Sequence, residues 1–186
     1  MAAIEPRFAP LAKASRKAAL AKCGVNWDQS AMKRILFVCL GNICRSPLAE
    51  GMFNYHMARS GTEWAASADS AGTSDWHGGE PPHPGSVRAA RNLGISLAGQ
   101  TSRQVAVSDF AQFDVILGMD RSNVENLRRL EAESPVGTAE IDLFLNYAGQ
   151  GLKDVPDPWG EGDAAYDAVA QIIGRAVPAI ASRLTS

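Results

Sequence analysis

The chain has 186 residues, of which 46% are hydrophobic and 20% charged, and its formal net charge at pH 7 is −2. This profile is typical of a globular protein with one substantial core. The charge provides no basic field for nucleic acid or an anionic membrane surface, and no apolar run approaches the ~20 residues of a membrane-spanning helix. We therefore predict neither nucleic acid nor a membrane as a partner.

The three cysteines are Cys23, Cys39 and Cys44. An odd number of cysteines in a chain of this length does not indicate a disulfide framework, so we expect a reducing, cytoplasmic setting.

Residues 1–32 have a composition of their own, alanine-rich and basic, with Glu5 as the only acid before Asp28. An organelle transit peptide can have this composition, whereas the apolar centre of a secretory signal is missing. The small and apolar residues recur at helical spacing and could form one side of a short surface helix: Leu11, Ala14, Ala18 and Ala21. We interpret residues 1–32 as an N-terminal extension to a domain of residues 33–186.

Short apolar runs and helical patterns alternate from residue 34 onward. The run 35–38 is typical of a central parallel strand covered on both faces. Ser46 followed by Pro47 predicts the start of a helix, with the Ser46 hydroxyl as its cap. One side of this helix holds Leu48, Met52 and Tyr55.

The remaining elements follow in order: a strand at 64–70 ending at Ala71-Gly72, a loop at 78–85, a helix at 86–93 stopped by Gly94, and strands at 115–117 and 141–145. Apolar residues then repeat every three or four positions from Tyr166 to Leu184, which predicts an amphipathic helix bent at Pro178. The alternation predicts an α/β fold: an open, mostly four-stranded parallel sheet with helices on both faces. Because ligands of such sheets bind beyond the carboxyl ends of the strands, we expect the chemistry in the loop 39–46.

This loop reads Cys-Leu-Gly-Asn-Ile-Cys-Arg-Ser. A cysteine and an arginine separated by five residues prove little by themselves, but Gly41 and Asn42 tolerate backbone conformations that turn successive N–H groups inward. Inward N–H groups at a helix N-terminus form a cradle for an anion. We therefore predict that a phosphate group binds to Leu40, Gly41, Asn42, Ile43, Cys44, Arg45 and Ser46.

Three side chains of the loop suit phosphoryl transfer. The cradle favours the thiolate of Cys39, which is the nucleophilic form. Arg45 can hold two phosphate oxygens in a bidentate fork, and the Ser46 hydroxyl is placed to donate to the sulfur as it leaves. A merely buried thiol at a strand end is the alternative for Cys39, and the loop around it argues against that alternative.

The loop, the strand before it and Pro47-Leu48-Ala49-Glu50 after it resemble the signature of the low-molecular-weight protein tyrosine phosphatases. The resemblance covers about residues 33–186 and recurs in Asp69-Ser70-Ala71-Gly72-Thr73, Arg103-Gln104, Asp109-Phe110, Phe113-Asp114, Met119-Asp120 and Val155-Pro156-Asp157-Pro158-Trp159. It implies a phosphotyrosine protein phosphatase I-like fold, no cofactor, and hydrolysis of phosphotyrosine in protein substrates through a phosphocysteine.

The leaving group of a phosphate ester needs a proton, so an acid must lie near the scissile oxygen. Asp157 lies between two prolines, which stiffen its loop and fix the direction of its carboxyl group. The resemblance implies that Asp157 is this general acid and that it then activates the water that hydrolyses the phosphocysteine. A solvated loop aspartate is the alternative.

Trp76 and Trp159 could wall the pocket and stack on a phosphotyrosine ring, or merely cover an edge of the core. Ile43 favours phosphotyrosine, because the family's protein-arginine phosphatases resemble one another in having threonine there. Two positions depart from the family pattern. Gly160 stands where many members have a second aromatic residue, and Gln100 where members often have a histidine bonded toward the loop asparagine.

His56, His77 and His83 lack metal-like spacing, so we interpret them as surface or packing residues and expect no metal. Cys44 either packs beneath the loop or traps oxidised Cys39 in a reversible disulfide.

Two other functions fit less well. The thioredoxin-coupled arsenate reductases that resemble this chain around the nucleophile relay oxidation through further cysteines, and no cysteine follows Cys44. A silent phosphoprotein-binding module is expected to have lost Cys39, Arg45 or Asp157, all of which are present. The sequence predicts neither the physiological substrate nor the oligomeric state.

Overall fold

The computed structural model describes residues 32–133 and 137–186, so the extension predicted for residues 1–32 lies, except for Met32, outside the described residues. The elements are β1 (Lys33–Cys39), α2 (Arg45–Arg59), β2 (Ala66–Gly72), α3 (Pro84–Asn92), α4 (Asp109–Gln112), β3 (Val115–Gly118), α5 (Arg121–Glu131), β4 (Glu140–Leu143), α6 (Phe144–Tyr147) and α7 (Asp163–Leu184). Among the described helices, none combines the length and the apolar character needed to cross a membrane.

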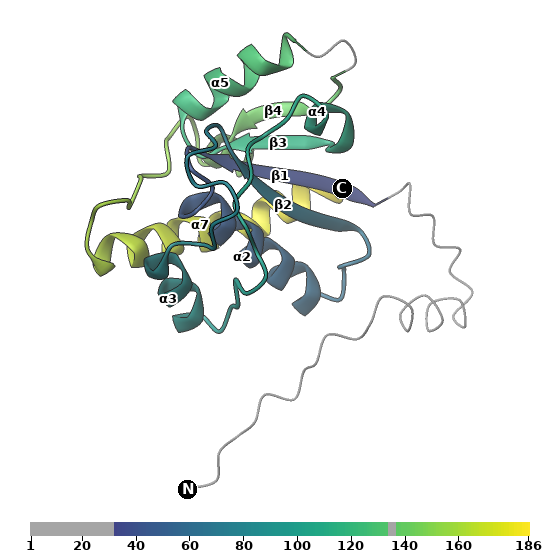
Figure 1. The fold of residues 1–186 in the computed structure, drawn as a ribbon. Helices are drawn as coiled ribbons and strands as arrows, with labels where there is room; N and C mark the ends of the chain where they lie inside the picture. Colours follow the sequence, from purple (N-terminus) through teal and green to yellow (C-terminus); the bar gives the residue numbers. More distant parts are fainter. Residues whose placement is uncertain (1–31, 134–136) are drawn as a thin grey trace, which may run out of the picture. The chain divides into compact units, whose positions relative to one another are not determined.

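The four strands form one parallel sheet in the order β2-β1-β3-β4 (Figure 1). This arrangement confirms the predicted α/β fold class. The register pairs Cys39 with Gly72, and Val38 with Gly118, so the carboxyl ends of the central strands meet at one edge. Cys39 ends the central strand β1 and therefore lies in the middle of that edge.

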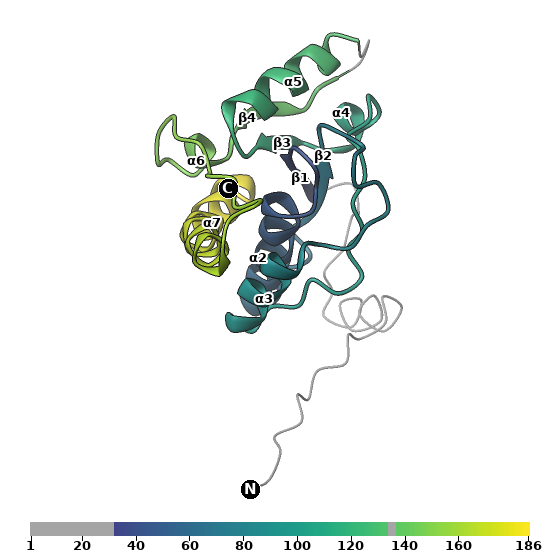
Figure 2. The same cartoon turned by 60° about the vertical axis from the view of Figure 1, so that its left-hand side comes forward.

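Helices cover both faces of the sheet: α2, α3 and α7 lie on one side, and α4 and α5 on the other (Figures 1 and 2). Side chains of β1 alternate between two hydrophobic clusters, because successive residues of a strand point to opposite faces. Ile35 and Phe37 pack in the cluster under α2 and α7, whereas Leu36 and Val38 pack in the other. The prediction of a central strand covered on both faces is confirmed.

Several predicted boundaries are wrong by a few residues. The second strand runs from Ala66 to Gly72, and the fourth ends at Leu143, because α6 begins at Phe144. The helix predicted from Ser86 begins at Pro84, where the His83 side chain caps it by accepting the N–H of Gly85. In α2, Leu48 and Met52 are buried as expected, whereas Tyr55 is exposed.

Candidate active site

The loop from Cys39 to Arg45 is held from outside through its carbonyl groups. The carbonyls of Cys39, Leu40, Ile43 and Cys44 accept hydrogen bonds from Thr73 N, Ser74 N, His83 N and Ser86 Oγ. In the described part of the chain, none of the N–H groups of residues 40–44 donates a backbone–backbone hydrogen bond. Loop N–H groups without a backbone partner are what an anion cradle requires.

Asn42 makes the turn of this cradle. Its φ of 54° is the only positive φ at a non-glycine residue in the described ranges, and asparagine tolerates this conformation. Its side chain donates to Ser46 Oγ and Ser70 Oγ, both at 2.9 Å, and accepts the N–H of Arg103 at 2.9 Å. Gly41 provides space rather than a special backbone conformation, because a Cβ there would lie 2.9 Å from His77 Cδ2.

Cys39 is buried, and its Sγ lies 3.1 Å from Ser46 Oγ. The Ser46 hydroxyl also donates a hydrogen bond to the carbonyl oxygen of Ala71, at 3.2 Å. The helix α2 begins at Arg45 with Cys44 at its N-cap position and no side-chain cap, so the prediction that Ser46 caps the helix is wrong. The hydroxyl lies beside the Cys39 sulfur instead, where the sequence analysis expected it to donate to that sulfur.

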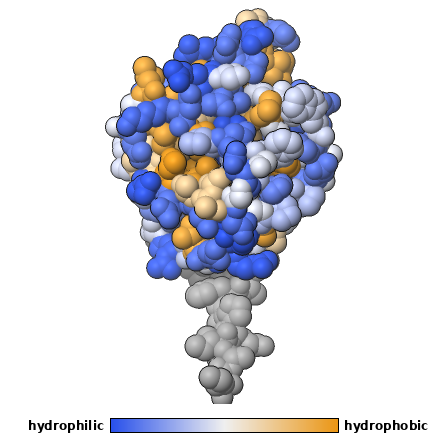
Figure 3. Space-filling view, turned by 90° about the vertical axis from the view of Figure 1, so that its left-hand side faces the viewer, coloured by the Kyte–Doolittle hydropathy of each residue, from blue (hydrophilic) through white to orange (hydrophobic). Residues whose placement is uncertain are grey.

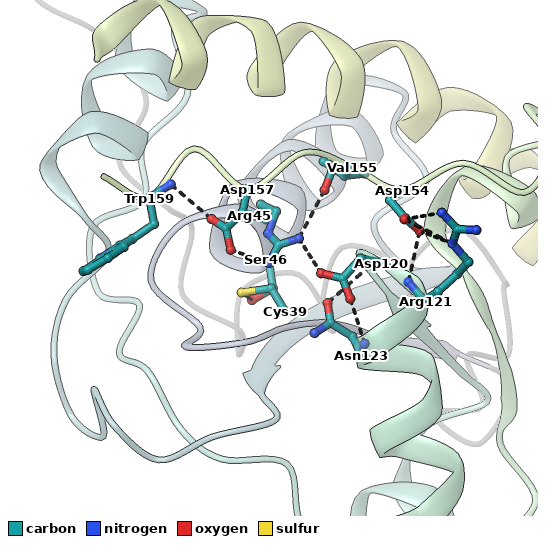
Figure 4. A network of polar contacts seen from close by, with 10 residues as sticks. All are labelled: Cys39, Arg45, Ser46, Asp120, Arg121, Asn123, Asp154, Val155, Asp157 and Trp159. Atoms are coloured by element: carbon teal, nitrogen blue, oxygen red, sulfur yellow. Dashed lines mark hydrogen bonds and ion pairs between the residues drawn. The ribbon is translucent and has the colours of Figure 1, made fainter. Parts of the chain in front are cut away.

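Arg45 is almost fully buried, between two carboxylates (Figure 4). Its Nη1 donates to Asp120 Oδ2 at 2.7 Å and to the carbonyl of Val155 at 3.1 Å, and its Nη2 donates to Asp157 Oδ2 at 2.6 Å. Burial opposes the charge, but Cys39 and the two carboxylates outweigh it and raise the pKa of Arg45. Arg45 Nε has no hydrogen-bond partner among the described residues, so the Nε and Nη2 edge of the guanidinium can serve as the fork.

Asp157 lies in the loop between α6 and α7, 112 residues from Arg45 in the chain. Its side chain is 41% exposed, and its Oδ1 accepts the N–H of Trp159 at 3.1 Å. The structure therefore brings together Cys39, Arg45 and Asp157.

A cavity of about 370 Å³ lies over the loop, lined by Cys39, Leu40, Gly41, Ile43, Cys44, Arg45, Trp76, His77, Asp157 and Trp159. Trp76 and Trp159 are 75% and 63% exposed, so they stand at the rim of the cavity rather than over an edge of the core. The left-hand side of Figure 1, where the strands end, faces the viewer in Figure 3, where small apolar patches alternate with polar side chains.

His77 is a site residue that the sequence analysis missed. It was interpreted as a surface or packing residue, yet it lines the cavity, with Nδ1 2.9 Å from Glu80 Oε2. Its place next to Trp76 was the available signal. His83, by contrast, packs as predicted, stacked on Tyr166 with 5.0 Å between ring centroids. Within the described ranges, no group of three or more potential ligands could hold a metal ion.

Cys44 is buried, with its Sγ 3.9 Å from Tyr166 Oη. Burial raises the pKa of its thiol to about 12. The second cysteine of the loop is therefore a neutral thiol at physiological pH.

The two departures from the family pattern have local explanations. The Gln100 amide donates to the Pro47 carbonyl at 3.1 Å, while Asn42 is held by the three contacts given above. Gly160 adopts a φ of 81°, which an aromatic residue would rarely adopt.

Comparison with known proteins agrees with this geometry. The sequence profile of the family "Low molecular weight phosphotyrosine protein phosphatase" matches residues 34–186. The low molecular weight protein-tyrosine-phosphatase YfkJ of Bacillus subtilis is 43% identical over 143 residues, which are 76% of this chain and 89% of that protein. The chain belongs to this family.

Solved structures of phosphatases share the fold. The crystal structure of YfkJ from Bacillus subtilis superposes with a TM-score of 0.75 at 40% identity, covering 82% of this chain and 94% of that one. A Drosophila arginine phosphatase gives a TM-score of 0.77 at 28% identity, covering 83% and 99% of the two chains. Because neighbours named for different phosphate substrates share the fold, the fold alone does not select between phosphotyrosine and phosphoarginine.

Proposed function

We propose that this member of the family hydrolyses phosphotyrosine in protein substrates, and small aryl phosphates, through a phosphocysteine intermediate. Cys39 is the nucleophile, Arg45 holds the phosphate, and Asp157 is the general acid and then the general base. The observation that carries the proposal is the convergence of these three side chains on one cavity, with Asp157 2.6 Å from Arg45.

The first step is transfer of the phosphoryl group to sulfur. The phosphate oxygens bind the N–H groups of residues 40–45 and the Nε–Nη2 edge of Arg45, and they compete with Asp157 for that edge. Cys39 attacks phosphorus while the bond to the ester oxygen breaks. The departing oxygen keeps the electron pair and takes a proton from Asp157.

The second step is hydrolysis of the phosphocysteine. The Asp157 carboxylate takes a proton from a water molecule, whose oxygen attacks phosphorus while the P–S bond breaks. The sulfur leaves as a thiolate, which accepts a hydrogen bond from Ser46 Oγ at the 3.1 Å contact. Inorganic phosphate is then released, and the enzyme returns to its starting state.

The preference for phosphotyrosine rests on the rim of the cavity. Trp76 and Trp159 offer aromatic surface on which a phenyl ring can stack. Ile43 lines the cavity with an apolar side chain and lacks the hydroxyl expected of the family's arginine phosphatases. Side-by-side hydrolysis of phosphotyrosine, phosphoarginine and phosphoserine peptides tests this preference, and a faster rate with phosphoarginine contradicts it.

The mechanism is tested with two variants. Cys39→Ser should lower turnover of an aryl phosphate by about 10³-fold or more, because the hydroxyl is a far weaker nucleophile at neutral pH. Asp157→Asn should lower kcat/KM by about 10²-fold for phenyl phosphate, and much less for dinitrophenyl phosphate, whose leaving group needs no proton. A loss that is equal for both esters would remove Asp157 from the acid role.

We also propose that Cys44 traps oxidised Cys39. Peroxide converts the Cys39 thiolate to a sulfenic acid, and the Cys44 sulfur attacks it with loss of water to give a disulfide. The raised pKa of Cys44 slows this step, since the thiolate is the attacking form. After peroxide treatment, a thiol reductant should restore more activity to the unmodified protein than to Cys44→Ser. Equal recovery would leave Cys44 with a packing role.

A further inference from the structure

The turn between β3 and α5 contacts both the phosphate clamp and the loop that bears Asp157. Three consecutive residues make these contacts: the Met119 carbonyl accepts the N–H of Val155 at 2.8 Å, Asp120 accepts from Arg45 at 2.7 Å, and Arg121 binds Asp154. The first two contacts support Arg45: Asp120 binds it directly, and Met119 holds Val155, whose carbonyl accepts a hydrogen bond from Arg45. The third involves side chains that take no direct part in the proposed reaction.

The contact between Arg121 and Asp154 is bidentate (Figure 4). Arg121 Nη2 lies 2.9 Å from Asp154 Oδ2, and Arg121 Nε lies 3.2 Å and 3.1 Å from Oδ1 and Oδ2. The backbone N–H of Arg121, the first residue of α5, also donates to Asp154 Oδ1 at 3.0 Å. The carboxylate therefore ties its loop to the positive end of a helix, and the Arg121 side chain lowers the pKa of Asp154.

Asp154, the carboxylate of this ion pair, lies three residues before Asp157. Between them, Val155 is buried and bonded on both sides, through its N–H to Met119 and through its carbonyl to Arg45 Nη1 at 3.1 Å. Pro156 has a fixed φ. The segment from Asp154 to Asp157 therefore has little freedom once Asp154 is held.

After Asp157, Pro158 is buried and has a fixed φ, and the chain beyond it is held less firmly. In the described chain, the hydrogen bonds of residues 158–161 are local: Trp159 N–H donates to Asp157, and Glu161 N–H donates to the Pro158 carbonyl at 3.0 Å. Gly160 adds a flexible position. Apart from the buried Pro158, the contacts between this loop and the rest of the domain therefore precede Asp157 in the chain.

We propose that Arg121 and Asp154 are positioning residues, which fix the loop so that the Asp157 carboxyl group stands beside Arg45 and the ester oxygen. The inference rests on the proposed role of Asp157 as the general acid. Arg121 is 75% exposed, and exposed ion pairs contribute little to global stability. We therefore expect that breaking the pair lowers the rate of the reaction and leaves the stability of the fold nearly unchanged.

The experiment compares Asp154→Asn and Arg121→Ala with the unmodified protein on two esters. Each variant should lower kcat/KM for phenyl phosphate about fivefold and leave that for dinitrophenyl phosphate within about twofold, because only the first ester needs a well-placed acid. Inhibition by inorganic phosphate and the urea unfolding midpoint should not change. Arg121→Lys should recover part of the loss, since lysine keeps the charge without the fork.

A matched control lies on the same helix. Arg129 and Glu125 form an exposed pair at 3.8 Å that does not touch the Asp157 loop, so Arg129→Ala should leave both rates unchanged. Equal losses on both esters, weaker phosphate inhibition or no loss in Asp154→Asn would overturn the proposal. A KM increase confined to phosphotyrosyl peptides in Arg121→Ala would also overturn it, since Arg121 would then contact the peptide.

Asp157→Asn separates this inference from the proposed function. If that variant loses activity equally on both esters, the acid role itself fails. If it shows the expected leaving-group dependence and Asp154→Asn does not, only the positioning role fails. In the Asp157→Asn background, Asp154→Asn should cause no further loss, because there is no acid left to position.

Discussion

Cys39 and Cys44 lie in one loop, yet their surroundings differ at the level of single atoms. The Cys39 sulfur faces the Ser46 hydroxyl and lies near the charge of Arg45. The Cys44 sulfur faces the Tyr166 hydroxyl, and burial raises its pKa from 9.0 to about 12. The same loop thus holds two sulfurs in different surroundings, and burial keeps the thiol of Cys44 protonated at physiological pH.

The raised pKa of Cys44 predicts an effect on stability at alkaline pH. Between about pH 9 and pH 12 the unfolded state has lost this proton and the folded state retains it, so stability falls as pH rises. The slope from one such group is at most about 1.4 kcal/mol per pH unit. Urea unfolding under reducing conditions should show a shallower alkaline decline in Cys44→Ala. Parallel declines would contradict the assignment.

At the scale of elements, β2 ends at Gly72, whose missing side chain lets the strand approach the loop 39–45 closely. A Cβ on Gly72 would lie 2.7 Å from the Leu40 carbonyl oxygen and 3.2 Å from the Asn42 nitrogen. Both atoms belong to the backbone of the loop, which cannot move aside without losing its shape. The close approach of strand and loop therefore requires glycine.

Gly72→Ala should lower the free energy of unfolding by about 1–3 kcal/mol through overpacking. It should also weaken inhibition by inorganic phosphate, because the loop must shift. Gly174→Ala in α7 is the matched control. Its Cβ would lie 3.8 Å from Met52 Sδ, and alanine should stabilise the helix by about 1 kcal/mol. Unchanged phosphate inhibition in Gly72→Ala would refute the required close approach.

At the scale of the whole molecule, three distant parts of the chain meet at one edge of the sheet. Asp120 and Asp157 are 75 and 112 residues from Arg45 in sequence, yet both contact it. Parallel strands place all their carboxyl ends on the same side, and the loops that follow them therefore converge. The described residues that form both hydrophobic clusters lie between Ile35 and Leu184, and the family profile matches residues 34–186.

We therefore propose that residues 33–186 form the phosphatase domain and that residues 1–32 are an extension. A chain that begins at Met32 should keep its kcat/KM for an aryl phosphate. Its free energy of unfolding should stay within about 1 kcal/mol of that of the full chain. The measurement is urea unfolding beside steady-state kinetics. A large loss of either quantity would place part of the domain in the extension.

The sequence by itself determined the features that depend on neighbours along the chain. The continuous apolar run 35–38 predicted the central strand, and the loop after it predicted the cradle, because hydrophobicity and backbone freedom are local properties. The predicted ends of β2 and β4 differ from the observed ones, since the pairing partner decides where a strand stops. Asp157 was found only through the family resemblance.

Only the tertiary structure decided which side chains meet. It brought Asp120 to Arg45, placed His77 in the cavity, and joined Arg121 to Asp154, 33 residues away. Each of these contacts joins segments that approach one another only when the sheet has formed. Hydrogen bonds and ion pairs act over a few ångströms, so no pattern along the chain specifies them before the fold brings their atoms together.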